Sequence, residues 1–171
     1  MAISNRVLAR AGMVLLAALL TSCATPPPAP GTPREAVLQA WGQPTARHAL
    51  PEGTERLEYA TGPFGRTTWM IDLDATGRVR QARQVLNEAE FLQVQIRAGS
   101  GALTREELLR WIGTPGERRH GGWAGGEVWS WRYPTNDCLW WQVSIGHDGK
   151  VISAGHGIDP LCDINDRATL F

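Results

Sequence analysis

The feature that most constrains the fold of this chain is an internal repeat. The segment 103–118 reads L-T-R-E-E-L-L-R-W-I-G-T-P-G-E-R, and a degenerate copy at 33–47 reads P-R-E-A-V-L-Q-A-W-G-Q-P-T-A-R, at an offset of 71 residues. Downstream the match continues at an offset of 72, where Trp69 falls on Trp141 and Gly77 on Gly149. Self-similarity at a fixed period indicates one supersecondary unit used more than once. We therefore interpret most of the chain as one unit used twice.

The repeat predicts both the domain organisation and the fold class. We expect a leader at 1–22, a tether at 23–33, a first unit at 34–86, a second unit at 87–162 and a tail at 163–171. Each unit reads as a helix, or a helix-turn-helix, followed by three or four antiparallel strands. The predicted fold class is therefore α+β, with two tandem two-layer units.

The composition narrows the class of function. Lys and Arg number 17 against 17 Asp and Glu, so no basic excess argues for a nucleic-acid partner. Eight Trp stand against three Phe and two Tyr, which is unusual. Trp serves core packing, and it is also favoured at protein interfaces. Both uses stay open for the individual Trp residues.

The N-terminus resembles a bacterial lipoprotein signal. Arg6 and Arg10 precede an unbroken small or apolar run from Ala11 to Leu20, which is too short to span a bilayer but suits a signal-peptide core. The run ends in Leu-Thr-Ser-Cys23, which resembles a lipobox. The resemblance implies a lipidated Cys23 and, because Ala24 rather than Asp follows it, an outer-membrane location on the periplasmic face. An ordinary cleaved signal with an incidental Cys is the alternative.

A Pro-rich segment follows the predicted lipidation site. Residues 24–33 read A-T-P-P-P-A-P-G-T-P. Pro at this density fits neither a helix nor a sheet ladder, so we expect an extended tether that keeps the domain near the membrane.

The first unit is predicted to begin with a helix. Thr32 suits the N-cap and Pro33 the first helical position, and the helix is expected to end at Gly42. Alternating residues predict strands at 56–59 and 68–74 and a third strand near 78–85. Asp72 and Asp74 lack a third metal ligand nearby in sequence, so we expect solvated acids on a strand face.

The second unit is predicted to keep two helices. Asn87 and Thr104 are the expected N-caps, with helices that end near Gly99 and Gly113. Strands are expected at 127–133 and 139–145, and the turn at Asp148-Gly149 leads to a third strand. Alignment with the first unit predicts that five side chains point toward the core: Trp129, Trp131, Trp141, Val143 and Ile145.

Two Trp residues have no predicted core position. Trp140 is expected on the opposite sheet face beside Gln142 and Arg132, and Trp123 lies in a Gly-rich loop. A Trp-plus-Arg sheet face is a candidate surface for a protein partner. Packing against the neighbouring unit is the alternative.

The cysteines indicate an oxidising compartment. With Cys23 lipidated, Cys138 and Cys162 form an even pair, for which a disulfide is the default. A zinc site of Cys138, His156 and Cys162 is conceivable, but no ligand spacing supports it. The sequence contains no recognised hydrolase, metalloprotease or phosphate-loop motif, so we predict a non-enzyme without a cofactor.

These features together resemble the SmpA/OmlA (BamE-like) family of small outer-membrane lipoproteins. The resemblance rests on the lipobox, on G-A-L-T-R-E-E-L at 101–108 and W-I-G-T-P at 111–115, and on D-G-K-V at 148–151. It implies a helix pair packed on an antiparallel sheet and a scaffolding role in the envelope. One departure is that the BamE-like proteins carry one such unit, whereas this chain has two.

The tandem arrangement is also similar to the β-lactamase inhibitory proteins, which use two units to form a continuous concave sheet. That family is secreted without lipid and has a disulfide in each unit, and this chain has one candidate disulfide. Two hypotheses follow. The first is a lipid-anchored periplasmic binding or scaffolding module, acting in outer-membrane protein assembly or envelope integrity, with barrel-assembly subunits as candidate partners. The second is a protein inhibitor of an envelope enzyme, with the Trp-bearing face as its contact surface.

Overall fold

The computed structural model describes residues 25–61, 66–121 and 125–162 and has an α+β fold built from two units. Each unit contains a four-stranded antiparallel sheet, with strand orders β1-β2-β3-β4 and β5-β6-β7-β8. The first unit comprises α2 (Arg34–Trp41), β1 (Ala46–Ala49), a 3-10 turn (Pro51–Gly53), β2 (Glu55–Thr61), β3 (Thr67–Leu73) and β4 (Val79–Gln84). The second comprises α3 (Glu88–Gly99), α4 (Arg105–Ile112), β5 (Glu117–His120), β6 (Glu127–Trp131), β7 (Leu139–Ile145) and β8 (Val151–Ile158).

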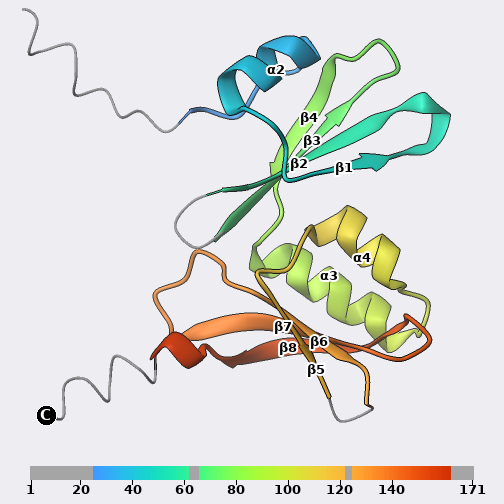
Figure 1. Cartoon of the computed structure of the whole chain (residues 1–171), viewed down its shortest axis with the longest axis vertical. Helices are drawn as coiled ribbons and strands as arrows, with labels where there is room; N and C mark the ends of the chain where they lie inside the picture. Colours follow the sequence, from blue (N-terminus) through green and yellow to red (C-terminus); the bar gives the residue numbers. More distant parts are fainter. Residues whose placement is uncertain (1–24, 62–65, 122–124, 163–171) are drawn as a thin grey trace, which may run out of the picture.

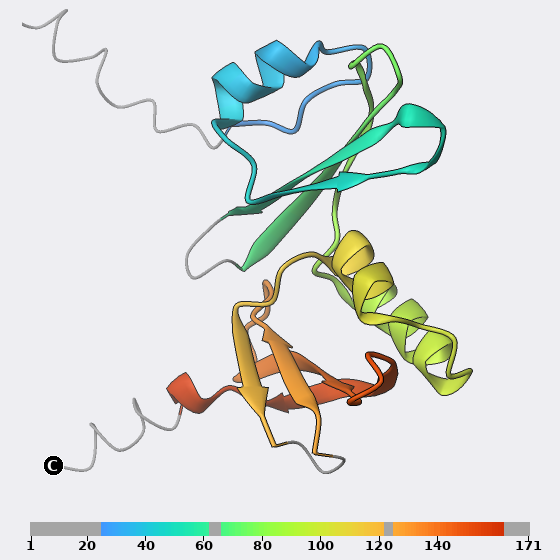
Figure 2. The ribbon, with the colours of Figure 1, turned by 45° about the vertical axis from the view of Figure 1, so that its right-hand side comes forward.

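The elements stack in four layers. Figures 1 and 2 show α2 on one side of the first sheet and the α3–α4 pair on the other side, between the two sheets. The second sheet packs on the α3–α4 pair; it lies below the pair in Figure 1 and beside it, to its left, in Figure 2. Within the part of the chain that the structure describes, helices therefore cover both faces of the first sheet and one face of the second.

The repeat predicted from sequence is present in the backbone hydrogen bonds. Arg34 N–H donates to Gly77 O over 2.9 Å, and Arg105 N–H donates to Gly149 O over 2.9 Å. The glycines that end α2 and α4 are also equivalent: the Tyr59 hydroxyl donates to Gly42 O, and the Trp131 indole N–H donates to Gly113 O. The same contact thus holds the helix end onto the second strand of each sheet, with Tyr in one unit and Trp in the other.

The helix caps agree with the sequence in the second unit and differ in the first. Thr104 and Glu107 form a full capping box at α4, and Asn87 accepts the Glu90 N–H at the start of α3. The prediction of Thr32 as a cap for α2 is wrong, because Pro33 occupies the N-cap position and the Thr32 hydroxyl donates to Ala29 O. Pro33 is held extended by its β-bridge to Arg78, so the helix begins one residue later than predicted.

The Trp residues assigned to the core are buried there. Trp129, Trp131 and Trp141 are each at most 1% exposed and lie in one cluster with residues from α3 and α4. The strands β1 and β5 were not predicted from sequence. Both are four-residue segments with polar composition, A-R-H-A and E-R-R-H, and neither alternates clearly enough to indicate a strand.

The first unit lacks a counterpart of α3 among its described residues, and Trp41 takes over part of that role. In the second unit, Phe91 of α3 stacks on Trp141 with ring centroids 4.4 Å apart. In the first unit, Trp41 stands where the repeat has Ile112, and its ring meets Trp69 edge-on at 5.9 Å. A larger side chain on α2 therefore covers the Trp that a separate helix covers in the second unit.

Polar contacts join the two units. On the face of the first sheet that meets α4, Glu58 is completely buried, and its carboxylate accepts the Thr114 N–H over 2.7 Å and contacts His48 Nε2 at 2.9 Å. Arg56 donates to Arg110 O at the end of α4 over 2.6 Å. The first sheet therefore binds the C-terminal end of α4 through one acceptor and one donor.

The expectation that Asp72 is solvated is wrong. Its side chain is 9% exposed and accepts hydrogen bonds from Arg56 Nη2 over 2.8 Å and from Gln81 over 2.7 Å. Burial would raise the pKa of Asp72, but the bonds from Arg56 and Gln81 outweigh it and hold the pKa below its ordinary value of 3.8. Sequence alternation placed Asp72 off the core correctly, but it could not show that α4 covers this face as well.

The low pKa of Asp72 predicts a stability difference that depends on pH. A carboxyl whose pKa falls on folding adds stability above its unfolded pKa and loses it as the pH drops through the folded pKa. We expect Asp72→Asn to lower the free energy of unfolding by roughly 2 kcal/mol at neutral pH, because Arg56 loses a charged partner. Urea unfolding of both proteins should show this gap shrinking below about pH 4 and disappearing at lower pH. A gap that stays constant with pH would contradict the ion pair.

Candidate functional site

The candidate site is the face of the second sheet that points away from α3 and α4. Because Trp141, Val143 and Ile145 of β7 point into the core, their neighbours Trp140, Gln142 and Ser144 point to the opposite side. We call this side the outer face of the second sheet; its described residues include Arg119, Val128, Ser130, Trp140, Gln142, Ser144, Ser153 and Gly155. Part of it forms an open hollow of about 600 Å³ between β5 and β8.

The structure brings together three of the predicted partner-binding residues, but it buries their central member. Trp140 is 1% exposed. The guanidinium carbons of Arg119 and Arg132 lie 5.1 Å and 5.2 Å from its ring centroid. These distances suit cation–π contacts, so the two Arg side chains cover the ring. Trp140 can support a binding surface, but a partner would meet the arginines before it meets the indole.

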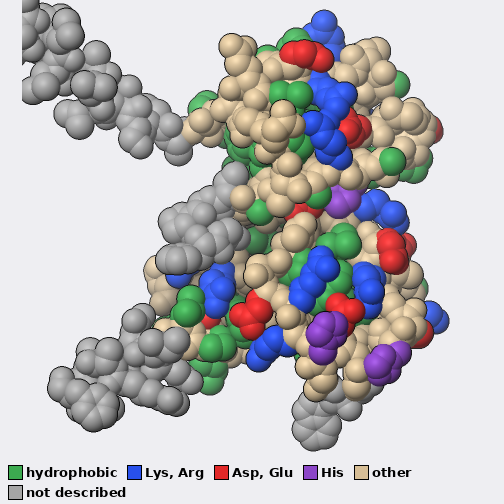
Figure 3. All heavy atoms as spheres, in the orientation of Figure 1, with side chains coloured by type: hydrophobic (Ala, Val, Ile, Leu, Met, Phe, Trp, Pro, Cys, Tyr) green, Lys and Arg blue, Asp and Glu red, His purple; other side chains and the backbone are tan. Residues whose placement is uncertain are grey.

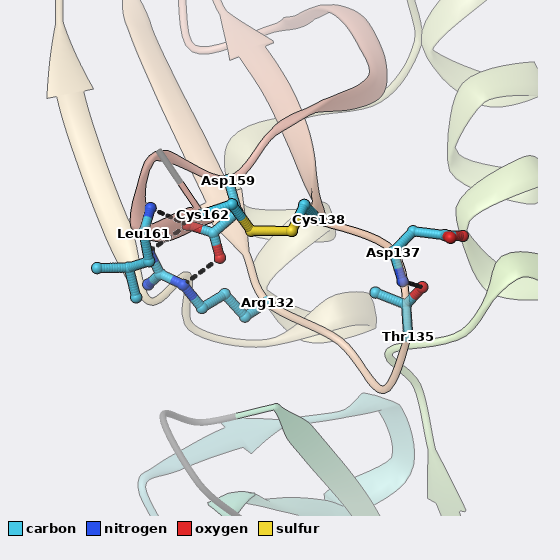
Figure 4. Close-up of a disulfide and its surroundings, with 7 residues drawn as sticks. All are labelled: Arg132, Thr135, Asp137, Cys138, Asp159, Leu161 and Cys162. Carbon is cyan, nitrogen blue, oxygen red and sulfur yellow. Dashed lines mark hydrogen bonds and ion pairs between the residues drawn. A yellow bond between two sulfur atoms is a disulfide. The ribbon is translucent and has the colours of Figure 1, made fainter. Parts of the chain in front are cut away.

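Arg132 is held at the edge of this face by an ion pair beside the disulfide. It donates to Asp159 through two bonds of 2.6 Å and 2.9 Å, as Figure 4 shows. The hydrogen bond to Asp159 raises the pKa of Arg132. Burial would raise the pKa of Asp159, but the bonds from Arg132 and from the Leu161 N–H outweigh it and lower that pKa. Arg132 is therefore committed to an internal partner.

The predicted pairing of Cys138 with Cys162 is present. Their Cα atoms are 5.8 Å apart, and the two sulfurs are bonded. The Asp159 N–H also donates to Cys138 O, so the end of β8 is tied to β7 by a hydrogen bond as well as by the disulfide. Among the described residues no cluster of three or more His, Cys, Asp or Glu could hold a metal ion.

Arg119 is a candidate binding residue that the sequence did not indicate. It lies in the unpredicted strand β5, and its side chain is 49% exposed. The Gln142 amide fits its neighbours when its oxygen faces Arg119 Nη2 at 2.7 Å, the Ser130 hydroxyl at 3.1 Å and Trp140 Nε1 at 3.2 Å. Trp140 and Gln142 therefore hold the Arg119 guanidinium from two sides. The available signal was the offset of 71 residues, which aligns Arg119 with His48 of the first sheet.

The remaining predicted site residues lie outside the described residues. These are Cys23, with the leader that precedes it, and Trp123 of the Gly-rich loop; the tail at 163–171 also lies outside. Lipidation at Cys23 and a binding role for Trp123 stay predictions. None of the described helices is long and apolar enough to cross a membrane. The described end of the tether is not free, because Gly31 N–H donates to Val79 O and Val79 N–H to Thr32 O.

Comparisons with known proteins add little to this site. No protein-family model matches the chain, and no curated protein matches it. One similar solved structure is a DUF4309 family protein (YjgB) from Bacillus subtilis subsp. subtilis str. 168, at 13% identity over 74% of this chain and 78% of that chain. Its TM-score is 0.29, which is too low to carry an argument about fold or function. The resemblance to the SmpA/OmlA family stays a prediction from sequence.

Proposed function

We propose that this chain is a lipid-anchored binding or scaffolding module of the bacterial cell envelope, located at the periplasmic face of the outer membrane. Its anchor would be the lipid on Cys23, and its partner would be an envelope protein bound on the outer face of the second sheet. The lipobox and the Pro-rich tether support the location. The repeated unit supports a binding role, because the first copy binds the second through the sheet face opposite its own helix.

One observation carries the choice of surface. The first sheet binds the end of α4 on the face opposite its own helix, through Glu58 and Arg56. The equivalent face of the second sheet is not covered by a helix of the described chain, and it is hollowed. In the first sheet, the face opposite α2 is therefore occupied by the end of α4. In the second sheet, the equivalent face is available to a partner.

On the face that Figure 3 draws, the surface is mixed in charge. On the side drawn in Figure 3, basic and acidic side chains are interspersed over both units, and apolar surface shows between them in small areas. The balance of 17 basic and 17 acidic residues agrees with this. The described residues on that side therefore show no large patch of one charge that would compete with the hollow for a charged partner.

The inhibitor hypothesis receives less support. That hypothesis requires both units to form one continuous sheet that binds the partner across its surface. The two sheets are separate, and α3 and α4 lie between them. A partner bound at the second sheet alone would also leave the first unit without a role in inhibition.

The proposal is tested by site-specific photo-cross-linking in the native membrane. A benzophenone amino acid at Ser153, in the hollow, should capture a protein from the envelope, while the same probe at the exposed Glu35 of α2 should not. Capture of barrel-assembly subunits would support a scaffold in outer-membrane protein assembly, and capture of one soluble periplasmic enzyme would favour inhibition. Equal capture at both positions, or none at Ser153, would reject the proposed surface.

The location has a separate test. Cys23→Ser should leave the chain unlipidated and release it from the outer membrane, because the anchor is the lipid alone. If the Cys23→Ser protein matured normally and stayed in the membrane fraction, the lipoprotein assignment would be wrong.

A further inference from the structure

The hollow on the outer face of the second sheet carries a distinct set of hydrogen-bonding groups. Its lining includes Arg119, His120, Gln142, Ser144 and Ser153, and the described residues that line it include no Asp or Glu. These side chains offer mostly N–H and O–H donors. A ligand that supplies acceptors and negative charge would satisfy them, whereas a basic ligand would find no carboxylate among the described residues of the lining.

The covered face of the first sheet carries a different set of polar groups. There the bound helix end is held by one carboxylate, Glu58, and one guanidinium, Arg56. At the repeat offsets, Ser130 replaces Glu58 and Val128 replaces Arg56, while Arg119 stands in the place of His48. The acid that receives a backbone N–H on the first sheet is thus absent from the second, and the guanidinium stands on the first strand of the sheet, at Arg119, instead of on the second strand, at Arg56.

Arg119 is also oriented before any ligand arrives. Its guanidinium lies over the Trp140 ring at 5.1 Å, and one of its N–H groups reaches the Gln142 carbonyl oxygen. Its only acidic contact among the described residues is Glu117 at 3.4 Å, with side chains 49% and 38% exposed. An exposed pair of this kind is weak, so a carboxylate of a ligand can replace Glu117. An oriented guanidinium loses little side-chain entropy when it binds a carboxylate in a bidentate manner.

We propose that the hollow binds an acidic segment of the protein partner, with a carboxylate of that segment paired to Arg119. This inference rests on the proposed function and names the chemistry of the partner at the same surface. Ser144 and Ser153, which face each other across β7 and β8, would donate to further acceptors of the segment.

The first experiment measures a defined acidic probe on the full-length protein in a zwitterionic detergent. A hexaglutamate peptide should bind and shift the side-chain NMR signals of Arg119 and Gln142, and hexaglutamine should not. Arg119→Gln should weaken hexaglutamate binding roughly tenfold, because a charge-assisted bidentate pair is lost. Arg118→Gln is the matched control: Arg118 has the same charge one residue away but lies over Trp129, on the core side of the sheet.

A pair of variants at Ser153 tests the sign of the charge on the natural partner. Ser153 is exposed in the hollow, so Glu and Lys, two long side chains of opposite charge, can both be placed there. Ser153→Glu should reduce recovery of the partner in a pull-down roughly tenfold, and Ser153→Lys should preserve or increase it.

The outcomes separate this inference from the proposed function. Capture of a partner at Ser153 that is unaffected by Arg119→Gln, together with a pull-down recovery that is the same for both Ser153 variants, would overturn the acidic segment and leave the binding module standing. No capture at Ser153 would reject the outer face as the partner's surface and the acidic partner segment with it, whereas the peptide assay measures only whether the hollow binds carboxylates. Hexaglutamate that fails to bind, or that binds Arg118→Gln and Arg119→Gln equally, would overturn the inference.

Discussion

Gly113→Ala is expected to lower the free energy of unfolding by about 4 kcal/mol, from two separate causes. Gly113 has φ 91° and ψ −173°, a backbone conformation that essentially only Gly adopts. An added Cβ would also lie 2.9 Å from Thr68 Cγ2 and 3.0 Å from the Glu58 carboxylate. Glu58 is completely buried and bonded to His48 and Thr114, so it cannot move aside without losing those contacts.

The repeat supplies a matched control for this variant. Gly42 ends α2 in the same way, with φ 75° and ψ −159°, but a Cβ there would meet nothing within 4 Å. Gly42→Ala should therefore carry only the backbone cost, about 2 kcal/mol. Urea unfolding followed by Trp fluorescence measures both variants. Equal losses for Gly42→Ala and Gly113→Ala would mean that the α4 end does not press against Glu58, and the described interface between the units would be wrong.

This contrast also marks the limit of what the sequence could predict. Gly42 and Gly113 were both identified as helix-ending glycines, because a Gly followed by Pro after an apolar helical face has a local cause. The local caps at Asn87 and Thr104 and the inward faces of β3 and β7 were predicted for the same reason. Periodicity and capping depend on residues a few positions apart in the chain, so the sequence alone is enough to predict them.

The contacts between the units could not be predicted in that way. Asp72 and Glu58 are acids on the non-core side of alternating strands, which ordinarily indicates solvent. They are buried because α4 of the other unit covers that side, and no local pattern specifies this neighbour. Trp140 is a related case. The sequence placed it on the correct face, but its burial depends on Arg119 in a short polar strand that has no clear periodicity.

Trp141→Ala is expected to lower the free energy of unfolding by about 4 kcal/mol, an effect as large as that of Gly113→Ala. Trp141 has no exposed surface and contacts Phe91 at 4.4 Å and Trp131 at 5.5 Å between ring centroids. Its indole nitrogen has no hydrogen-bond partner among the described residues, so the loss is one of packing rather than of a hydrogen bond. Because α3 lies directly on this ring, the cavity is closed on every side and cannot collapse easily.

The equivalent variant in the first unit should be milder. Trp69 is only partly buried, and the side chain that covers it is Trp41 of α2 rather than a separate helix. Trp69→Ala should therefore cost about 2 kcal/mol, since Trp41 can settle into the vacated space. Denaturant unfolding of both variants decides the matter. If Trp69→Ala cost as much as Trp141→Ala, Trp41 would not be a movable substitute for a missing helix. The first unit would then have to be as tightly packed as the second, and its single helix would be sufficient by itself to close the core.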